Sequence, residues 1–430
     1  MILYVDVSLL GGWLPWTLRV LTVLLVVAAI GRRRLRDRKF LLQRLPLVVV
    51  GAAVFGLLCS VLVRTVLDIT DPLPFDMWCW LAVFALASGL GAVCWRGSRW
   101  WQRTAAPLAM LLALLTAGNA LNISLGYFPT LADMYGELTN QALPQQISMA
   151  QLPTVHGNTG TGRIVQVDIP ATPSGFQHRT EYVYLPPAWF RSTHRPKLPV
   201  IEMIGGEYAV PDNWVRAGNA VKTADAYATE HHGFAPVLVF ADASGGFKVD
   251  TECVNGTAGK AGDHLVKDIP QFVQKNFGTF TSAGHWAIAG WSMGGTCAIT
   301  LSLTHPNVFG HFLDISGDIG PNIGDRNSTI SKLYAGNAAA YEANDPMTVL
   351  AAMLAKHKKF PKGFSGVFAD GDVEDKHIQQ AHQLADAATK VGVESQVYVA
   401  SGKHSWTFAQ SVFKTQLPWL AKVLQVPGAK

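Results

Sequence analysis

The chain is short of charged residues. Asp, Glu, Lys and Arg make up 15% of its 430 residues, whereas about 25% is usual in a soluble protein. Hydrophobic residues make up 49%, and the mean hydropathy is positive at +0.20. We therefore expect part of the chain not to face water, and the length allows two domains.

The chain also lacks a basic soluble region. The formal net charge is +5, but residues 1–126 hold twelve of the 35 Lys and Arg and only five of the 30 Asp and Glu. The remainder carries a slight acidic excess. Since nucleic-acid binding needs a basic face on a folded domain, we exclude nucleic acid as a partner.

Cysteine is scarce, and none of the five cysteines lies in a CxxC or Cys/His cluster. Only Cys253 and Cys297 fall in the polar part of the chain. A disulfide between them suits an oxidising compartment, but the sequence does not establish its geometry and we do not predict it.

We predict no metal site and no cofactor. His377 and His382 are five apart on a predicted helix and match no metal-ligand spacing. Other histidines are interpreted as surface or packing residues, namely His231, His232, His264, His305 and His311.

Four long apolar runs precede residue 126, at about 10–30, 45–67, 77–95 and 106–123. Each is near the roughly 20 residues that cross a bilayer core, and Trp residues gather at their ends, as at a membrane interface. The alternative, buried helices of a soluble bundle, is disfavoured because the runs hold almost no charge. We predict a transmembrane region of four helices over 1–126.

The loops between these runs predict the orientation. Seven Arg and Lys lie between the first and second runs and three between the third and fourth, whereas the middle loop holds Asp68, Asp71 and Asp76. The positive-inside rule makes the basic loops cytoplasmic and everything after residue 126 extracytoplasmic, in a multi-pass protein of the cell membrane. The topology inverts if the first run does not span, although its charge follows the apolar stretch, unlike in a signal peptide.

Two arginines, Arg19 and Arg64, interrupt the apolar runs. Both fall toward the predicted outer side, where a long side chain can extend to the interface. The alternative is a polar site inside the membrane.

A polar, proline-containing linker is expected over 127–162, and residues 163–430 then alternate short apolar runs with amphipathic ones. This order predicts an α/β domain with a mostly parallel sheet and helices on both faces. The first two strands have no helix between them, so an antiparallel edge is expected. The predicted strands are 164–169, 180–185, 198–203, 236–241, 286–289, 311–315, 366–369 and 396–399, and the predicted helices are 213–229, 265–276, 294–303, 348–356, 376–390 and 407–424.

The pentapeptide Gly290-Trp291-Ser292-Met293-Gly294 carries the chemistry. Such a pattern arises often by chance in a glycine-rich chain. Here it follows a predicted buried strand and opens a predicted helix, the context that exposes a serine nucleophile on a sharp turn.

A serine hydroxyl needs a base, and in this arrangement the order is Ser, acid, His. His404 follows the last predicted strand, and the loop after the preceding strand offers Asp370, Asp372, Glu374 and Asp375. Glu374 is our first choice and Asp372 the alternative. These acids could instead cap the next helix, a role that we expect of Asp375.

Backbone N–H groups are expected to stabilise the oxyanion. Met293 N–H follows directly from the turn. A second donor should come from the loop after the third strand, where we predict Glu207 N–H, with Gly206 the neighbouring candidate. The alternative for that loop is an ordinary tight turn.

Residues 162–424 resemble the esterase branch of the α/β-hydrolases, which includes esterase D, feruloyl and enterochelin esterases and the mycobacterial mycolyltransferases. The resemblance rests on YVYLPP (182–187), GWSMGG (290–295), His305-Pro306, DISG (314–317) and His404-Ser405-Trp406. A Ser-Trp pair after the histidine and a glutamate acid are similar to the mycolyltransferases. The resemblance implies an acyl-enzyme on Ser292, released to water or to a sugar hydroxyl such as that of trehalose.

The leading hypothesis is a membrane-anchored serine esterase or acyltransferase that acts on lipid or glycolipid esters of the cell envelope. The rival is a catalytically inactive hydrolase-like binding module on a membrane anchor. Filled positions for serine, acid and histidine favour the enzyme.

Overall fold

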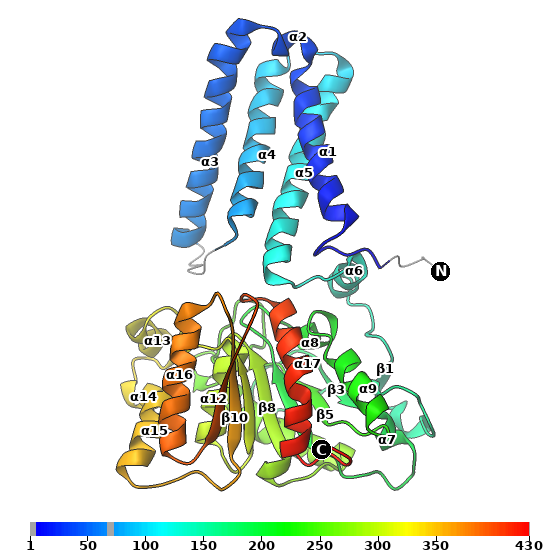
Figure 1. The fold of residues 1–430 in the computed structure, drawn as a ribbon, viewed down its shortest axis with the longest axis vertical. Helices are drawn as coiled ribbons and strands as arrows, with labels where there is room; N and C mark the ends of the chain where they lie inside the picture. The colour runs from blue at the N-terminus through cyan, green and yellow to red at the C-terminus, as the bar shows by residue number, and fades with distance from the viewer. Residues whose placement is uncertain (1–5, 67–72, 430) are drawn as a thin grey trace. The chain divides into compact units, whose positions relative to one another are not determined.

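The computed structural model describes residues 6–66 and 73–429, and it divides into two compact units, Met1–Thr139 and Asn140–Lys430. Predictions for Asp68, Asp71 and the side chain of Arg64 lie outside the described part. Figure 1 shows a helical N-terminal unit and an α/β C-terminal unit.

The first unit contains four helices long and apolar enough to cross a membrane, as predicted from the apolar runs. Leu and Val side chains cover their outer surfaces, whereas the inner face of α5 is lined by small residues, including Ala109, Ala113 and Ala117. Small residues let helices approach closely within a bilayer. The helices are α1 (Trp13–Ile30), α3 (Leu45–Val66, continuing the π-helix Phe40–Arg44), α4 (Phe75–Cys94) and α5 (Trp100–Leu125), with the short α2 (Arg32–Leu35) after α1.

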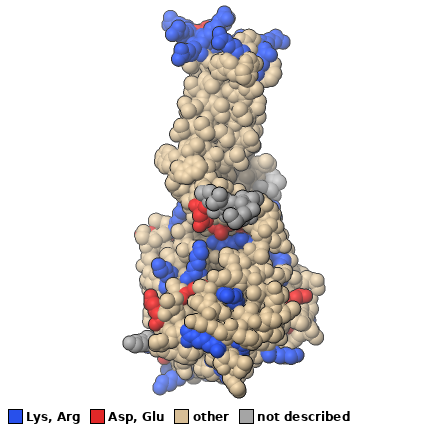
Figure 2. All heavy atoms as spheres, turned by 90° about the vertical axis from the view of Figure 1, so that its right-hand side faces the viewer, with Lys and Arg blue, Asp and Glu red and all other residues tan. Residues whose placement is uncertain are grey.

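The charge of this unit is concentrated at one end. Figure 2 shows Lys and Arg gathered there and almost none along the sides. Arg34 joins the two basic loops, because its guanidinium donates to the carbonyls of Cys94 and Arg96, both at 2.8 Å. Arg19 forms a 2.6 Å ion pair with Asp76 at the start of α4, so this arginine has a counter-ion within the unit.

The segment predicted as a linker, 127–162, differs from the prediction because it contains regular structure. Helix α6 (Leu131–Leu138) begins after Thr130, whose hydroxyl accepts from Asp133 N–H. Strand β1 (Gln146–Ser148) pairs with the sheet of the second unit, so that unit begins before residue 163. Three residues are too few for an alternating pattern, and pairing with a neighbouring strand defines β1.

The second unit is built on a nine-stranded sheet in the order β1-β2-β3-β5-β4-β8-β9-β10-β11. Every neighbouring pair is parallel except β2–β3 and β3–β5. The predicted antiparallel pairing is thus present, but β1 forms the edge. All eight predicted strands are found, and the α/β class is confirmed. Their bounds are β2 Arg163–Val167, β3 Glu181–Leu185, β4 Val200–Ile204, β5 Val237–Phe240, β8 Trp286–Trp291, β9 His311–Ile315, β10 Ser365–Gly371 and β11 Glu394–Ala400.

Helices pack on both faces of the sheet, with α9 against α17 in one group and α12, α15 and α16 in another. The predicted helix 213–229 is broken, because Asn219 adopts a left-handed conformation (φ 47°) between α8 and α9. The helices with a predicted counterpart are α8 Asn213–Arg216, α9 Ala220–Glu230, α11 Ile269–Phe277, α12 Met293–Thr304, α15 Pro346–Ala355, α16 Asp375–Lys390 and α17 Trp406–Val423. Elements without one are α7 Pro187–Phe190, α10 Ala261–Asp263, α13 Arg326–Leu333, α14 Ala338–Asn344 and the hairpin β6 Asn255–Gly256 with β7 Gly259–Lys260.

Candidate active site

Ser292 lies on the sharp turn between β8 and α12. Its backbone has φ 59° and ψ −123°, a conformation that L-residues rarely adopt. A Cβ on Gly290 would lie 2.0 Å from the carbonyl oxygen of Gly294, and one on Gly294 would lie 2.3 Å from that of Ile204. Both glycines are therefore required for the turn to fit between β4 and α12.

The structure brings His404 to this serine from the loop between β11 and α17. Its Nε2 lies 2.8 Å from Ser292 Oγ, and its Nδ1 lies 2.9 Å from Glu374 Oε1. Ser405 is the N-cap of α17 and accepts from Phe408 N–H, which fixes the residue next to the histidine. The three side chains thus form a continuous hydrogen-bonded series.

The other acids of the β10 loop lie elsewhere. Asp372, the alternative acid, accepts a hydrogen bond from Gly402 N–H at 3.0 Å. This bond links the loop after β10 to the loop that carries His404. Asp375 is the first residue of α16 and forms no cap, because the N-cap position is Glu374. Asp370 is buried, and burial raises its pKa to about 7.

Glu374 is held in place and held ionised. Its Oε2 accepts from the hydroxyl of Ser316 at 2.9 Å and from Gly371 N–H at 3.0 Å. Burial alone would raise its pKa, but hydrogen bonds from His377 and His404 outweigh burial and hold the pKa well below its usual range. The carboxylate therefore stays charged at neutral pH.

Two backbone segments meet the serine where an oxyanion would form. Met293 is the first residue of α12, so its N–H has no acceptor one turn earlier in the helix. The predicted second loop is also adjacent, because a Cβ on Gly206 would lie 3.3 Å from Ser292 Cβ. Glu207 follows directly in the chain.

An aromatic column supports the histidine, and the sequence analysis did not identify it. The ring of Trp291 lies 5.2 Å from that of His404 and 4.7 Å from that of Trp406. Trp406 in turn packs edge-on against Trp214, at 5.1 Å. The Trp before the serine and the Trp two residues after the histidine were visible in the motifs, but their contact depends on the fold.

His377 is a second imidazole on the same acid, also missed from the sequence. Its Nδ1 lies 3.2 Å from Glu374 Oε1. The available signal was its position three residues after Glu374 in the first turn of a helix, where i and i+3 side chains are neighbours.

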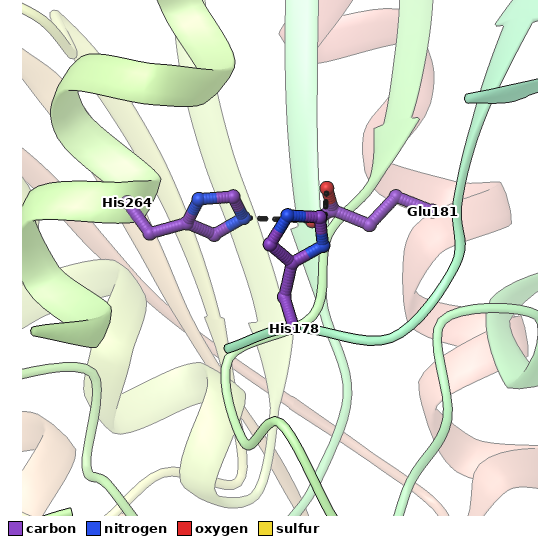
Figure 3. Close-up of side chains that lie close together, drawn as sticks. All are labelled: His178, Glu181 and His264. Carbon is purple, nitrogen blue, oxygen red and sulfur yellow. Dashed lines mark hydrogen bonds and ion pairs between the residues drawn. The ribbon is translucent and has the colours of Figure 1, made fainter. Parts of the chain in front are cut away.

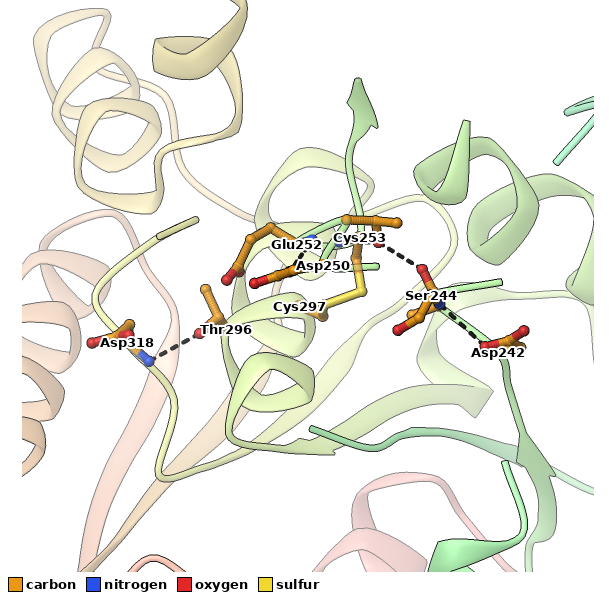
Figure 4. Close-up of a disulfide and its surroundings, with 10 residues drawn as sticks. Asp242, Ser244, Asp250, Glu252, Cys253, Thr296, Cys297 and Asp318 are labelled. Atoms are coloured by element: carbon orange, nitrogen blue, oxygen red, sulfur yellow. Dashed lines mark hydrogen bonds between the residues drawn. A yellow bond between two sulfur atoms is a disulfide. The ribbon is translucent and has the colours of Figure 1, made fainter. Parts of the chain in front are cut away.

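Cys253 and Cys297 form a disulfide (Figure 4). The sequence does not predict this bond, because its geometry depends on the fold, which brings together two cysteines 44 residues apart. Cys297 lies in α12, one turn beyond Ser292, and Cys253 lies in the long loop after β5. The disulfide therefore fastens that loop beside the candidate nucleophile.

We expect removal of this disulfide to destabilise the second unit. The Cys253→Ser/Cys297→Ser double variant should lose about 2–4 kcal/mol of its free energy of unfolding, because closing a loop of this length restricts the unfolded chain. Chemical denaturation with and without reductant measures this. Reductant should lower the stability of the wild type and leave the variant unchanged. Equal stability of the two proteins would contradict the expectation.

His178, Glu181 and His264 form a buried network (Figure 3). His264 had been interpreted as a surface or packing residue, but its Nε2 lies 3.2 Å from Glu181 Oε1 and its Nδ1 lies 3.0 Å from Asp268 Oδ2. Both ring nitrogens of His178 contact backbone carbonyls, at 2.9 and 2.7 Å. Glu181 also accepts from Asp242 N–H, which connects the network to the loop after β5.

This network predicts a pH dependence of stability. Burial lowers the pKa of His264, but hydrogen bonds and charge from Glu181 and Asp268 raise it above 6.5 overall. The stabilisation is therefore complete below about pH 6.5 and is lost as the pH rises through the folded-state pKa. Unfolding free energies from pH 5.5 to 8.5 should fall for the wild type and change less for His264→Gln. If the free energy of unfolding fell equally with pH in the wild type and in His264→Gln, His264 would not be the source of the pH dependence.

Comparison with known proteins agrees with the fold. The family model described as "Putative esterase" matches residues 176–420. An uncharacterized protein of Corynebacterium glutamicum is 28% identical over 366 residues, covering 82% of this chain and 83% of that protein. The matched share is larger than the Asn140–Lys430 unit, so the match extends into the helical unit.

Two mycobacterial proteins match smaller parts of the chain. "Diacylglycerol acyltransferase/mycolyltransferase Ag85B" of Mycobacterium intracellulare is 24% identical over 37% of this chain, and the match spans 55% of that protein. "MPT51 antigen" of Mycobacterium leprae is 30% identical over 31% of this chain and 44% of that protein.

Among solved structures, an S-formylglutathione hydrolase from Agrobacterium tumefaciens superposes with a TM-score of 0.50 at 18% identity. The match covers 62% of this chain and 97% of that one, and it shows the fold. The family model spans more than half of the chain. The matched residues include the turn that carries Ser292, the loop that carries Glu374, and His404. The chain therefore belongs to the esterase family of α/β-hydrolases.

Proposed function

We propose that this protein is a membrane-anchored serine esterase or acyltransferase that works through an acyl-enzyme on Ser292. The observation that carries the proposal is the series Ser292–His404–Glu374, with heavy-atom distances of 2.8 and 2.9 Å. A base within hydrogen-bond reach of the hydroxyl and a carboxylate that orients the base are what nucleophilic serine catalysis requires.

In the first half-reaction Ser292 Oγ attacks the ester carbonyl, and its proton passes to His404 Nε2. Glu374 keeps Nδ1 protonated and balances the imidazolium charge. Met293 N–H and a second N–H from Gly206 or Glu207 bind the oxyanion. The ester C–O bond then breaks, and the alcohol leaves with the proton from His404.

In the second half-reaction His404 removes a proton from water or from an acceptor hydroxyl, which attacks the acyl-serine. The chemistry of the two outcomes is the same, and the second nucleophile decides between hydrolysis and transfer.

We further propose that the site faces the extracytoplasmic side. The basic loops mark one end of the helical unit as cytoplasmic under the positive-inside rule. The chain leaves that unit after α5, whose C-terminus lies at the opposite end from those loops. The Cys253–Cys297 bond supports this side, because disulfides persist in oxidising compartments.

The proposed substrates are lipid or glycolipid esters of the cell envelope. Four helices of membrane-spanning length in the same chain would keep the site close to a bilayer. The M. intracellulare relative, a diacylglycerol acyltransferase/mycolyltransferase by name, supports acyl transfer from a lipid ester.

The purified full-length chain in lipid nanodiscs should release fatty acid from a diacyl lipid, or pass it to an added sugar, and mass spectrometry should find a transient acyl adduct on Ser292. Turnover of short soluble esters without any turnover of lipid would refute the proposal that lipid esters are the substrates. Labelling of intact cells by an impermeant fluorophosphonate tests which side of the membrane the site faces. Labelling only after lysis would place the site on the cytoplasmic side.

A further inference from the structure

Two imidazoles and one carboxylate converge beside the nucleophile. His404 Nδ1 and His377 Nδ1 lie 2.9 and 3.2 Å from the same oxygen, Glu374 Oε1. The ligand atoms that the three residues offer lie within 4.8 Å of one another. Glu374 and His377 lie at the start of α16, after β10, and His404 lies in the loop after β11, so no sequence spacing reveals the whole cluster.

This donor set and its dimensions suit a transition metal. Two His and one Glu are a known zinc ligand set, and tetrahedral Zn²⁺ with bonds of about 2.0–2.1 Å places its ligand atoms about 3.3 Å apart. The observed separations from Glu374 are close to that value.

The surroundings favour a cation and allow it to enter. Asp318 Oδ1 lies 3.8 Å from His377 Nε2, and charge from Asp318, Glu374 and Asp370 acts on the His377 ring. The side chains of His377 and His404 are 22% and 32% exposed, so solvent reaches the cluster.

The other cluster of this kind among the described residues lacks these features. His178, Glu181 and His264 are nearly or fully enclosed. Both ring nitrogens of His178 already contact the carbonyls of Arg179 and Ile169, and an ion would have to displace one of these contacts.

We propose that Glu374, His377 and His404 form an inhibitory binding site for Zn²⁺ or a similar divalent transition metal. An imidazole that coordinates through Nδ1 gives up the hydrogen bond that it now donates to Glu374, and in a neutral ring the proton moves from Nδ1 to Nε2. The ion takes both the orienting carboxylate and the base from Ser292. The enzyme is then switched off reversibly without covalent change.

The inhibition rests on the proposed function, whereas metal binding does not, so both are measured. Full-length protein in detergent, freed of metal, is titrated with ZnCl₂ while hydrolysis of a chromogenic ester is followed. Zn²⁺ should inhibit the wild type and a chelator should restore activity. Mg²⁺, which prefers oxygen ligands, should not inhibit.

Loss of one ligand identifies the site. His377→Gln should need at least about tenfold more Zn²⁺ for half-inhibition, whereas His382→Gln, an exposed histidine on the same helix, should match the wild type. The same shift should appear in binding of Co²⁺ followed by its visible absorption, and His404→Gln should weaken this binding as well.

Equal Zn²⁺ sensitivity and equal Co²⁺ binding in wild type and His377→Gln would overturn the proposed metal site. Absence of ester hydrolysis in metal-free protein would instead refute the proposed function, and Co²⁺ binding would still decide the metal site.

Discussion

Ser292→Ala is expected to abolish ester turnover, with a loss in kcat on the order of 10⁶-fold, as for removal of the nucleophile in other serine hydrolases. The hydroxyl is the atom that forms the acyl-enzyme, and its 2.8 Å contact with His404 Nε2 provides its activation. Steady-state hydrolysis of a chromogenic ester measures the effect.

Ser411→Ala is the matched control, because Ser411 is exposed on α17 and its hydroxyl should not affect the rate. Circular dichroism and thermal unfolding must show that both variants keep the fold. A folded Ser292→Ala protein with more than a few per cent of wild-type turnover would contradict the assigned nucleophile. Absence of turnover in the folded wild type would instead favour the rival hypothesis that this domain binds without catalysis.

The second large effect separates the two acids considered from the sequence. Glu374→Gln should lower kcat by about 10⁴-fold, because an amide no longer holds the His404 tautomer or balances the imidazolium. The loss should appear mainly in kcat, since the acid acts on the transition state and not on binding of the ester.

Asp372→Asn is the comparison variant, because this side chain accepts a hydrogen bond from Gly402 N–H and does not contact His404 in the described structure. It should change kcat by far less than Glu374→Gln does. A double variant Glu374→Gln/His404→Gln should be hardly slower than His404→Gln alone, because the two residues act together. A larger loss in Asp372→Asn than in Glu374→Gln would assign the acid to Asp372.

The central sheet could be predicted from the sequence because its strands are buried on both faces and appear as continuous apolar runs. β8 and β9 are buried at every position. β1 could not be predicted, because three mostly polar residues carry no pattern. Helices α13 and α14 were missed for a related reason, since few of their side chains are buried.

The candidate site divides in the same way. The sharp turn between β8 and α12 has a local sequence signature, the pentapeptide 290–294, and this signature identifies Ser292. His404 and Glu374 follow from the order of strands, and the preference for Glu374 over Asp372 rested on its position before the helix and was supported by the resemblance. Side-chain direction in a loop depends on contacts such as that of Ser316 with Glu374, and no sequence pattern shows these.

The aromatic column and the disulfide could not be derived at all. Each joins residues on different elements whose proximity exists only in the folded chain. Cys297 and Cys253, for example, meet because α12 packs beneath the loop that follows β5.

The most direct test of the central claim is the stoichiometry and position of covalent labelling by a fluorophosphonate. Intact-protein and peptide mass spectrometry of the purified chain should find one phosphonyl group per molecule, on Ser292, and none on Ser292→Ala. Failure of the folded wild-type protein to take the label, or equal labelling of the variant, would contradict the claim that His404 and Glu374 activate Ser292.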